Sequence, residues 1–158
     1  MSANDDYVIW APACSDRGVY PELGGSPGEQ KLEVCVIFTE MPGTRAALHT
    51  AEALAQRLSA YIRLLVPVEV PYALPLTEPA VPVQFLQGQM RNLASEIRLE
   101  VAAHICLCRD KRRALNSLLR PQRPVVIGGK KHWWPTREQR LAQALAKNGY
   151  EVIFAELR

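Results

Sequence analysis

The sequence predicts a single open α/β domain, a three-layer arrangement in which helices cover both faces of a parallel five-stranded sheet. Two observations support this fold class. Short apolar runs alternate with segments of helical periodicity from residue 31 to residue 158, which is the pattern of repeated βαβ units. Several of the runs are continuously apolar rather than alternating, as expected for strands buried on both faces. With 158 residues, 48% of them hydrophobic, the chain can bury one ordinary core.

The first βαβ unit is predicted at residues 32–39, about 44–60 and 61–70. Residues 32–39 are short, apolar and β-branched, which favours a central strand. Thr44 can cap the helix that follows, and this helix has apolar side chains at helical spacing. These side chains belong to Ala47, Leu48, Ala51, Leu54, Ala55 and Leu58.

Residues 1–30 differ from the rest of the chain. Glycines and prolines interrupt them and no period persists, so we expect an irregular or flexible extension outside a domain formed by residues 31–158. Within the extension, the short apolar run of residues 7–11 could pack on the domain.

The middle of the chain repeats the βαβ pattern after a proline-rich loop. Four prolines between residues 71 and 82 are too closely spaced for a regular helix or strand. A helix at about 83–97 and a strand at 99–108 follow. A short helix comes next, with Ala114, Leu115, Leu118 and Leu119 on one side.

The last βαβ unit starts with an apolar strand at residues 125–129. Thr136 and Gln139 have the spacing of a capping box and begin a helix that is predicted to extend to about residue 148. Gly149 stands where a left-handed helix cap belongs, and residues 150–155 form the fifth strand.

Charge is distributed unevenly along the chain. The net charge is +3, but residues 109–140 contain ten basic and two acidic residues, whereas the rest contains nine basic and fourteen acidic ones. A basic half can attract phosphates or nucleic acid, or it can simply be the solvated faces of two helices and a loop. The sequence alone favours the solvated faces, so nucleic acid is not an expected partner, and nucleic-acid or polyanion binding through the basic half is kept as a weaker alternative function.

The carboxyl edge of the sheet is the place where a ligand site is expected. In open α/β sheets ligands bind at this edge, where the strand order reverses. Residues 125–129 end there in two glycines, which permit a close backbone approach, and the next five residues are two lysines, a histidine and two tryptophans. The candidate ligand-binding residues are Thr39, Glu40, Thr44, Gly128, Gly129, Lys130, Lys131 and Trp133.

Three local motifs point to one family. Phe38-Thr39, a short loop and residues 44–55 follow a family pattern of a strand ending in Val-Asp, a loop and Ser-x-x-Ala-Leu-x-x-Ala-x-x-Leu-Ala. Residues 109–111 stand in place of Gly-Asp-Pro, and residues 125–129 are similar to Val-Val-Gly-Ser. In these motifs and their order, the domain resembles the universal stress protein family. The resemblance implies an adenine-nucleotide-binding, Rossmann-like or flavodoxin-like sheet with strand order 3-2-1-4-5.

The chain departs from this family at the residues that hold ATP. Thr39 replaces an aspartate, and in the Gly-x-x-Gly motif Gly128 matches the first glycine while Lys131 replaces the second. The later Gly-Ser would fall near Leu141 and Ala142, inside a helix. We therefore expect a divergent member, a non-enzymatic stress-response or signalling module with a degenerate nucleotide site.

In an alternative interpretation, the protein binds ATP or another adenine nucleotide at a rebuilt phosphate site. Lys130 and Lys131 would act as point charges on phosphate, and Trp133 and Trp134 would stack on a base or ribose. If no nucleotide binds, the lysines are solvated and the tryptophans cover an exposed edge of the core.

Neither catalysis nor metal binding is expected. The sequence contains no nucleophile elbow, no Walker motif and no dinucleotide-binding glycine motif. His104, Cys106 and Cys108 share one face of the third strand, but side chains two residues apart along a strand are separated by about 7 Å, too far for one zinc ion.

The sequence also leads to expectations about the localisation and the assembly of the protein. The acidic N-terminus, the absence of a bilayer-length apolar run and the four cysteines without a disulfide-scaffold pattern predict a cytoplasmic protein without a membrane partner. The resemblance implies a homodimer through the apolar last strand, residues 150–157, which would otherwise be an exposed edge. The candidate interface residues are Tyr150, Val152, Ile153 and Phe154.

Overall fold

A computed structural model describes residues 3–4, 7–10 and 32–157 of the chain, and all structural statements below refer to them. The elements in chain order are β1 (Ala3–Asn4), β2 (Tyr7–Trp10), β3 (Glu33–Ile37), α1 (Met41–Leu58), β4 (Tyr61–Glu69), α2 (Val83–Ser95), β5 (Val101–Cys108), α3 (Lys111–Leu118), β6 (Val125–Gly129), α4 (Arg137–Lys147) and β7 (Val152–Glu156).

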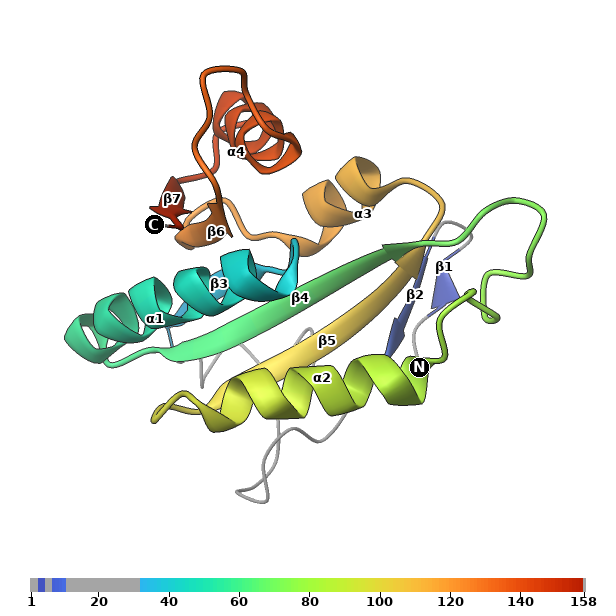
Figure 1. Ribbon diagram of the computed structural model, residues 1–158, viewed down its shortest axis with the longest axis horizontal. Helices are drawn as coiled ribbons and strands as arrows, with labels where there is room; N and C mark the ends of the chain where they lie inside the picture. Colours follow the sequence, from blue (N-terminus) through green and yellow to red (C-terminus); the bar gives the residue numbers. More distant parts are fainter. Residues whose placement is uncertain (1–2, 5–6, 11–31, 158) are drawn as a thin grey trace.

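Seven strands form one twisted sheet in the order β1-β2-β5-β4-β3-β6-β7 (Figure 1). The five strands from β5 to β7 are mutually parallel, so the predicted order 3-2-1-4-5 is confirmed. β3 is central and buried along its whole length, as the apolar run predicts.

The N-terminal extension contributes two further strands. β2 pairs with β5 in antiparallel register, with Tyr7 opposite Cys108, and β1 pairs with β2. The sequence predicts no regular structure in this region, although it allows residues 7–11 to pack on the domain. The rest of the extension lies outside the described residues. Because β2 covers the side of β5, β1 and β7 form the edges of the described sheet.

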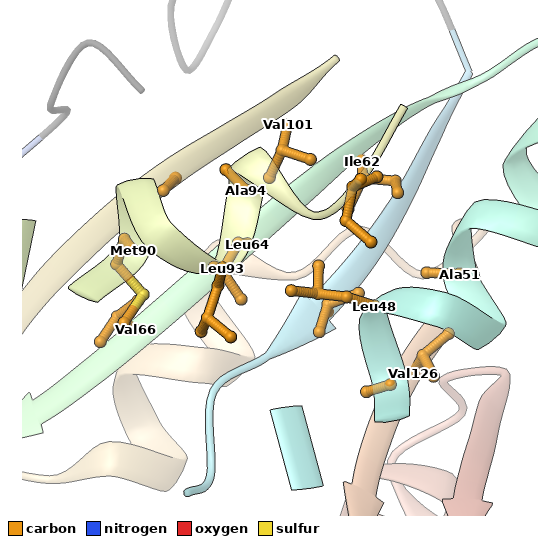
Figure 2. Packing of buried hydrophobic residues seen from close by; sticks show 14 of the residues in the cluster. Leu48, Ala51, Ile62, Leu64, Val66, Met90, Leu93, Ala94, Val101 and Val126 are labelled. Atoms are coloured by element: carbon orange, nitrogen blue, oxygen red, sulfur yellow. The ribbon is translucent and has the colours of Figure 1, made fainter. Parts of the chain in front are cut away.

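Helices cover both faces of the sheet, as predicted (Figure 1). On one face α1 and α2 pack against the strands, and Figure 2 shows Leu48 of α1, Met90 and Leu93 of α2, and Leu64 of β4 meeting there. Each of these side chains is essentially inaccessible to solvent, and burial of such a side chain contributes about 1.5–3 kcal/mol. On the other face, Leu115 of α3 and residues of α4 cover a second cluster.

The sequence misplaced the start of α1. The helix begins at Met41 with Glu40 as its N-cap, so Thr44 lies inside the first turns and is not the cap. Pro42 explains the earlier start, since the fixed φ of proline suits the first turn of a helix.

The start and end of α4 were predicted correctly. The Thr136 hydroxyl accepts from the Gln139 N–H at 3.2 Å, and the Gln139 side chain accepts from the Thr136 N–H at 2.8 Å, which confirms the capping box. Gly149 follows the helix with a φ of +91°, the left-handed conformation that favours glycine.

Candidate functional site

The strand order reverses between β3 and β6, which lie side by side at the centre of the sheet. α1 follows β3 on one face, and α4 follows β6 on the other. Thr39 comes two residues after the end of β3, and Gly128 and Gly129 end β6. The structure therefore brings these residues to the edge where the sequence predicts a ligand site.

The two threonine hydroxyls at this edge bond within the protein. Thr39 Oγ1 donates to the carbonyl oxygen of Gly128 at 2.9 Å, and the Thr39 N–H donates to Thr44 Oγ1 at 3.0 Å. Thr44 is fully buried. Both hydroxyls were predicted as ligand groups, yet their observed partners are backbone groups of the neighbouring loop and strand.

The glycines allow α1 to approach β6 at backbone distance. A Cβ added to Gly43 would lie 2.6 Å from the carbonyl oxygen of Gly128, and one added to Gly128 would overlap the carbonyl oxygen of Gly43. A Cβ on Gly129 would lie 3.0 Å from the Cβ of Glu138 in α4. In the described structure, the close approach that the two glycines of β6 permit is made by helices.

The N-terminus of α1 has features that oppose anion binding. A helix N-terminus can bind an anion through its free N–H groups. Pro42 is one of the first three helical residues, whose N–H groups have no partner within the helix, and it has no N–H to offer. The Glu40 side chain is exposed and places a carboxylate beside this terminus. A phosphate would meet like charge there.

The lysines and tryptophans lie in an exposed loop, residues 130–136. The ammonium of Lys131 is 3.9 Å from the Glu156 carboxylate at the end of β7. Since β7 and β3 flank β6 on opposite sides, this contact draws Lys131 away from Thr39. Trp133 is 94% exposed and Trp134 78%, which excludes the interpretation that they cover the core. The predicted ligand residues thus divide into a closed group around Gly128 and an open group in the loop.

A groove between α3 and α4, with a volume of about 450 Å³, is a feature that the sequence did not predict. Its polar lining consists of Arg112, Asn116, Arg140, Gln143, Lys147 and Asn148, over apolar residues of α4. No lining residue is acidic. The basic composition of residues 109–140 was a signal for such a surface, but the groove exists because the fold places the two helices side by side.

A buried polar cluster on the α3 side of the sheet was also missed. Glu33 and Arg63 are both almost fully buried, with a carboxylate oxygen 3.6 Å from the guanidinium. Tyr61 donates to Glu33 at 2.8 Å, and Arg120 lies 3.9 Å from the same carboxylate. Arg63 also donates to the carbonyl oxygen of Leu118 at 3.3 Å, at the end of α3. The sequence did contain a signal for this cluster, namely a charged residue within each of two strands that are otherwise apolar.

Two buried groups near the cluster, His104 and Cys35, have pKa values that favour their neutral forms. Burial, reinforced by the nearby Arg63 charge, lowers the pKa of His104 from 6.5 to about 4. Burial raises the pKa of the Cys35 thiol to about 12. Among the described residues, His104 Nδ1 and two nitrogens of Arg63, Nε and Nη2, have no hydrogen-bond partner.

The described residues contain neither a cluster of metal-ligating side chains nor a helix that could span a membrane. No three His, Cys, Asp or Glu side chains of residues 3–4, 7–10 and 32–157 are grouped so that they could hold a metal ion. In the same residues, every helix is too short or too polar to cross a bilayer.

Comparison with known proteins adds no relative. Neither the models of known protein families nor the curated proteins include a match to this sequence.

Proposed function

We propose that the chain is a universal-stress-protein-like, non-enzymatic stress-response or signalling module in which the nucleotide site has degenerated. The observation that supports this most is the backbone contact between Gly43 and Gly128 at the switch point. Folds of this kind bind nucleotide phosphates at that edge, on backbone N–H groups of a glycine-rich turn. Here α1 lies directly against the strand end where such a turn would begin.

The hydrogen bonds around this contact support the same conclusion. A nucleotide would have to break the bond from Thr39 Oγ1 to the Gly128 carbonyl oxygen or displace the first turn of α1. It would also have to tolerate the Glu40 carboxylate. Each change has a cost, and each lost hydrogen bond costs about 1 kcal/mol.

A non-enzymatic role agrees with two of the titratable groups in the core, His104 and Cys35. General acids, bases and thiol nucleophiles work best with pKa values near the operating pH. The pKa values of His104 and Cys35 are shifted to about 4 and about 12, away from neutrality, and both side chains are buried.

Calorimetric titration with ATP, ADP and AMP tests the proposal. We expect no saturable heat up to about 1 mM ligand, a concentration that corresponds to a binding free energy of about −4 kcal/mol. Lys131→Ala is the matched variant, because Lys131 belongs to the rebuilt phosphate site. Micromolar binding that Lys131→Ala weakens would establish the alternative, a nucleotide-binding protein, and refute the degenerate site.

We also propose that the module is a homodimer through β7. This strand pairs only with β6 among the described strands, and Val152, Ile153 and Phe154 are half-buried. The N–H of Val125 donates to the Glu151 carbonyl oxygen, and that of Leu157 to the Gly129 carbonyl oxygen. Because the bonding direction alternates along a strand, the N–H groups of Val152 and Phe154 face the open edge.

The oligomeric state can be measured by size-exclusion chromatography with light scattering. We expect a dimer at micromolar concentration, and we expect Val152→Pro to dissociate it, since proline removes an outward N–H at a position where strands tolerate it. Val152→Thr keeps the N–H and serves as the control. A wild-type chain that is only monomeric would contradict the dimer.

A further inference from the structure

We propose that the loop of residues 130–136 and the groove between α3 and α4 together bind single-stranded nucleic acid. The inference rests on the proposed function, in which the switch point is closed to nucleotides and the module acts through another surface. The sequence alone did not favour nucleic acid. Two observations change that balance: the exposure of the tryptophans, and a basic groove whose lining begins at Arg140 in the helix that follows them.

The groove concentrates positive charge without a compensating carboxylate. Arg112 comes from α3, and Arg140 and Lys147 come from α4; all three are exposed. None of them forms an ion pair within the described part of the chain. Phosphate groups bound in such a groove release counterions, which drives association with a polyanion.

The groove is preformed rather than assembled by a ligand. Asn148 Nδ2 donates to Asn116 Oδ1 at 3.2 Å, and the Tyr150 hydroxyl donates to the carbonyl oxygen of Asn116 at 3.1 Å. These bonds tie residues that directly follow α4 to the last turn of α3. Gln143 supplies an exposed amide in the lining, which can donate to a phosphate, sugar or base.

The two tryptophans are too exposed to contribute to the packing of the described core. Trp133 is 94% exposed and Trp134 78%, between the exposed Lys131 and the start of α4. Proteins that bind single strands combine basic grooves with aromatic side chains on which successive bases stack. Stacking needs bases whose faces are free, which favours a single strand over a duplex.

The loop and the groove are continuous along the chain. The carbonyl oxygen of Lys130 accepts from Thr136 Oγ1 at 3.4 Å, so the two ends of the loop are held together at the start of α4. Arg140, one turn into α4, already lines the groove. In Figure 1 the loop between β6 and α4 extends away from the sheet alongside α4, with α3 as the neighbouring helix. The proposal places a nucleic-acid strand stacked on the loop along α4, whose residues from Arg140 onward line the groove.

A membrane surface is the main competing partner, because lysine and tryptophan are also enriched at lipid interfaces. The groove distinguishes the two partners. A concave, polar, basic groove fits a chain of phosphates, whereas an interfacial surface exposes an apolar face flanked by cations.

Fluorescence anisotropy of labelled oligo-dT and oligo-rU, each about 15 nucleotides long and so within the usual range of site sizes, tests the proposal with the full-length protein. We expect binding that weakens steeply with salt. Trp133→Ala/Trp134→Ala should weaken it at least fivefold, the equivalent of about 1 kcal/mol and the lower end for stacking, while Trp133→Phe/Trp134→Phe should retain more affinity.

Charge variants test the groove separately. Arg112→Gln/Arg140→Gln should reduce the slope of log affinity against log salt by about 1.4, since each phosphate contact on a single strand contributes about 0.7. The matched control is Arg57→Gln/Arg91→Gln, which removes the same charge from exposed positions of α1 and α2 on the opposite face and should leave the slope unchanged.

Three results would overturn the inference. The first is no anisotropy change up to about 100 µM protein at low salt, the weak end of non-specific binding. The second is equal affinity for polyglutamate and for the oligonucleotides, insensitive to the tryptophan variants. The third is tryptophan-dependent binding to vesicles containing phosphatidylserine without oligonucleotide binding. None of these results affects the proposed function, which is tested with mononucleotides and not with oligonucleotides.

Discussion

Replacing Gly128 by alanine should destabilise the protein, because α1 and β6 are in backbone contact at this residue. The added Cβ would overlap the carbonyl oxygen of Gly43, lie 2.7 Å from its carbonyl carbon and lie 3.1 Å from the Cβ of Ala47. The first two atoms belong to the backbone and cannot rotate away. The first turn of α1 must therefore move from β6.

The size of the effect follows from two contributions. Overpacking a well-filled site typically costs about 1–3 kcal/mol. A displacement of α1 also strains the bond from Thr39 Oγ1 to the Gly128 carbonyl oxygen, which contributes about 1 kcal/mol. We expect the free energy of unfolding to fall by roughly 2–4 kcal/mol, which urea denaturation followed by circular dichroism can measure.

Gly88→Ala is the matched control for this substitution. A Cβ on Gly88, inside α2, would meet nothing within 4 Å. The same change should therefore stabilise the protein by about 0.5–1 kcal/mol, the helix-propensity difference between glycine and alanine. A free energy of unfolding of Gly128→Ala within about 0.5 kcal/mol of the wild-type value would refute the reasoning. The closed contact between α1 and β6 would then not exist.

Three further predictions concern the buried polar cluster. The pKa of His104 is about 4 in the folded protein against 6.5 for the ordinary side chain, so the unfolded chain binds more protons between these values. The free energy of unfolding should consequently fall by roughly 3 kcal/mol as the pH is lowered from 6.5 to 4, and His104→Gln should remove that part of the pH dependence; equal pH profiles for the two proteins would contradict this. Glu33→Ala leaves the buried Arg63 without its counter-charge and should lower the free energy of unfolding, measured by urea denaturation, by about 3–5 kcal/mol. The double variant Glu33→Leu/Arg63→Met should restore most of this stability; a mild effect of Glu33→Ala would show that the pair is solvated. Burial raises the pKa of Cys35 to about 12, so iodoacetamide at about pH 8 should label this thiol only after unfolding, as judged by peptide mass spectrometry; rapid labelling of the native protein would refute its burial.

The parallel sheet could be predicted from sequence because its strands are buried on both faces. Runs such as residues 125–129 remain apolar over their whole length, and only a doubly covered strand requires that. The capping box at Thr136 and the left-handed Gly149 were equally predictable, since each depends on local backbone chemistry.

The site was harder to predict because its properties depend on contacts between distant segments. Gly128 looks the same in sequence whether it leaves space for a phosphate or for a helix, and the contact with Gly43 spans 85 residues. Glu33 and Arg63 pair only because β3 and β4 are neighbours in the sheet. The groove between α3 and α4 likewise depends on the placement of two helices that the sequence identifies only one at a time.

Amide chemical shifts of ¹⁵N-labelled protein during an ATP titration test the central claim, closure of the switch point, most directly. The account predicts that the amides of Gly43, Thr44 and Gly128 keep their shifts up to about 1 mM ATP, whatever changes occur elsewhere. Saturable shifts of these three amides at lower concentrations would show that a nucleotide enters between α1 and β6, and would contradict the account.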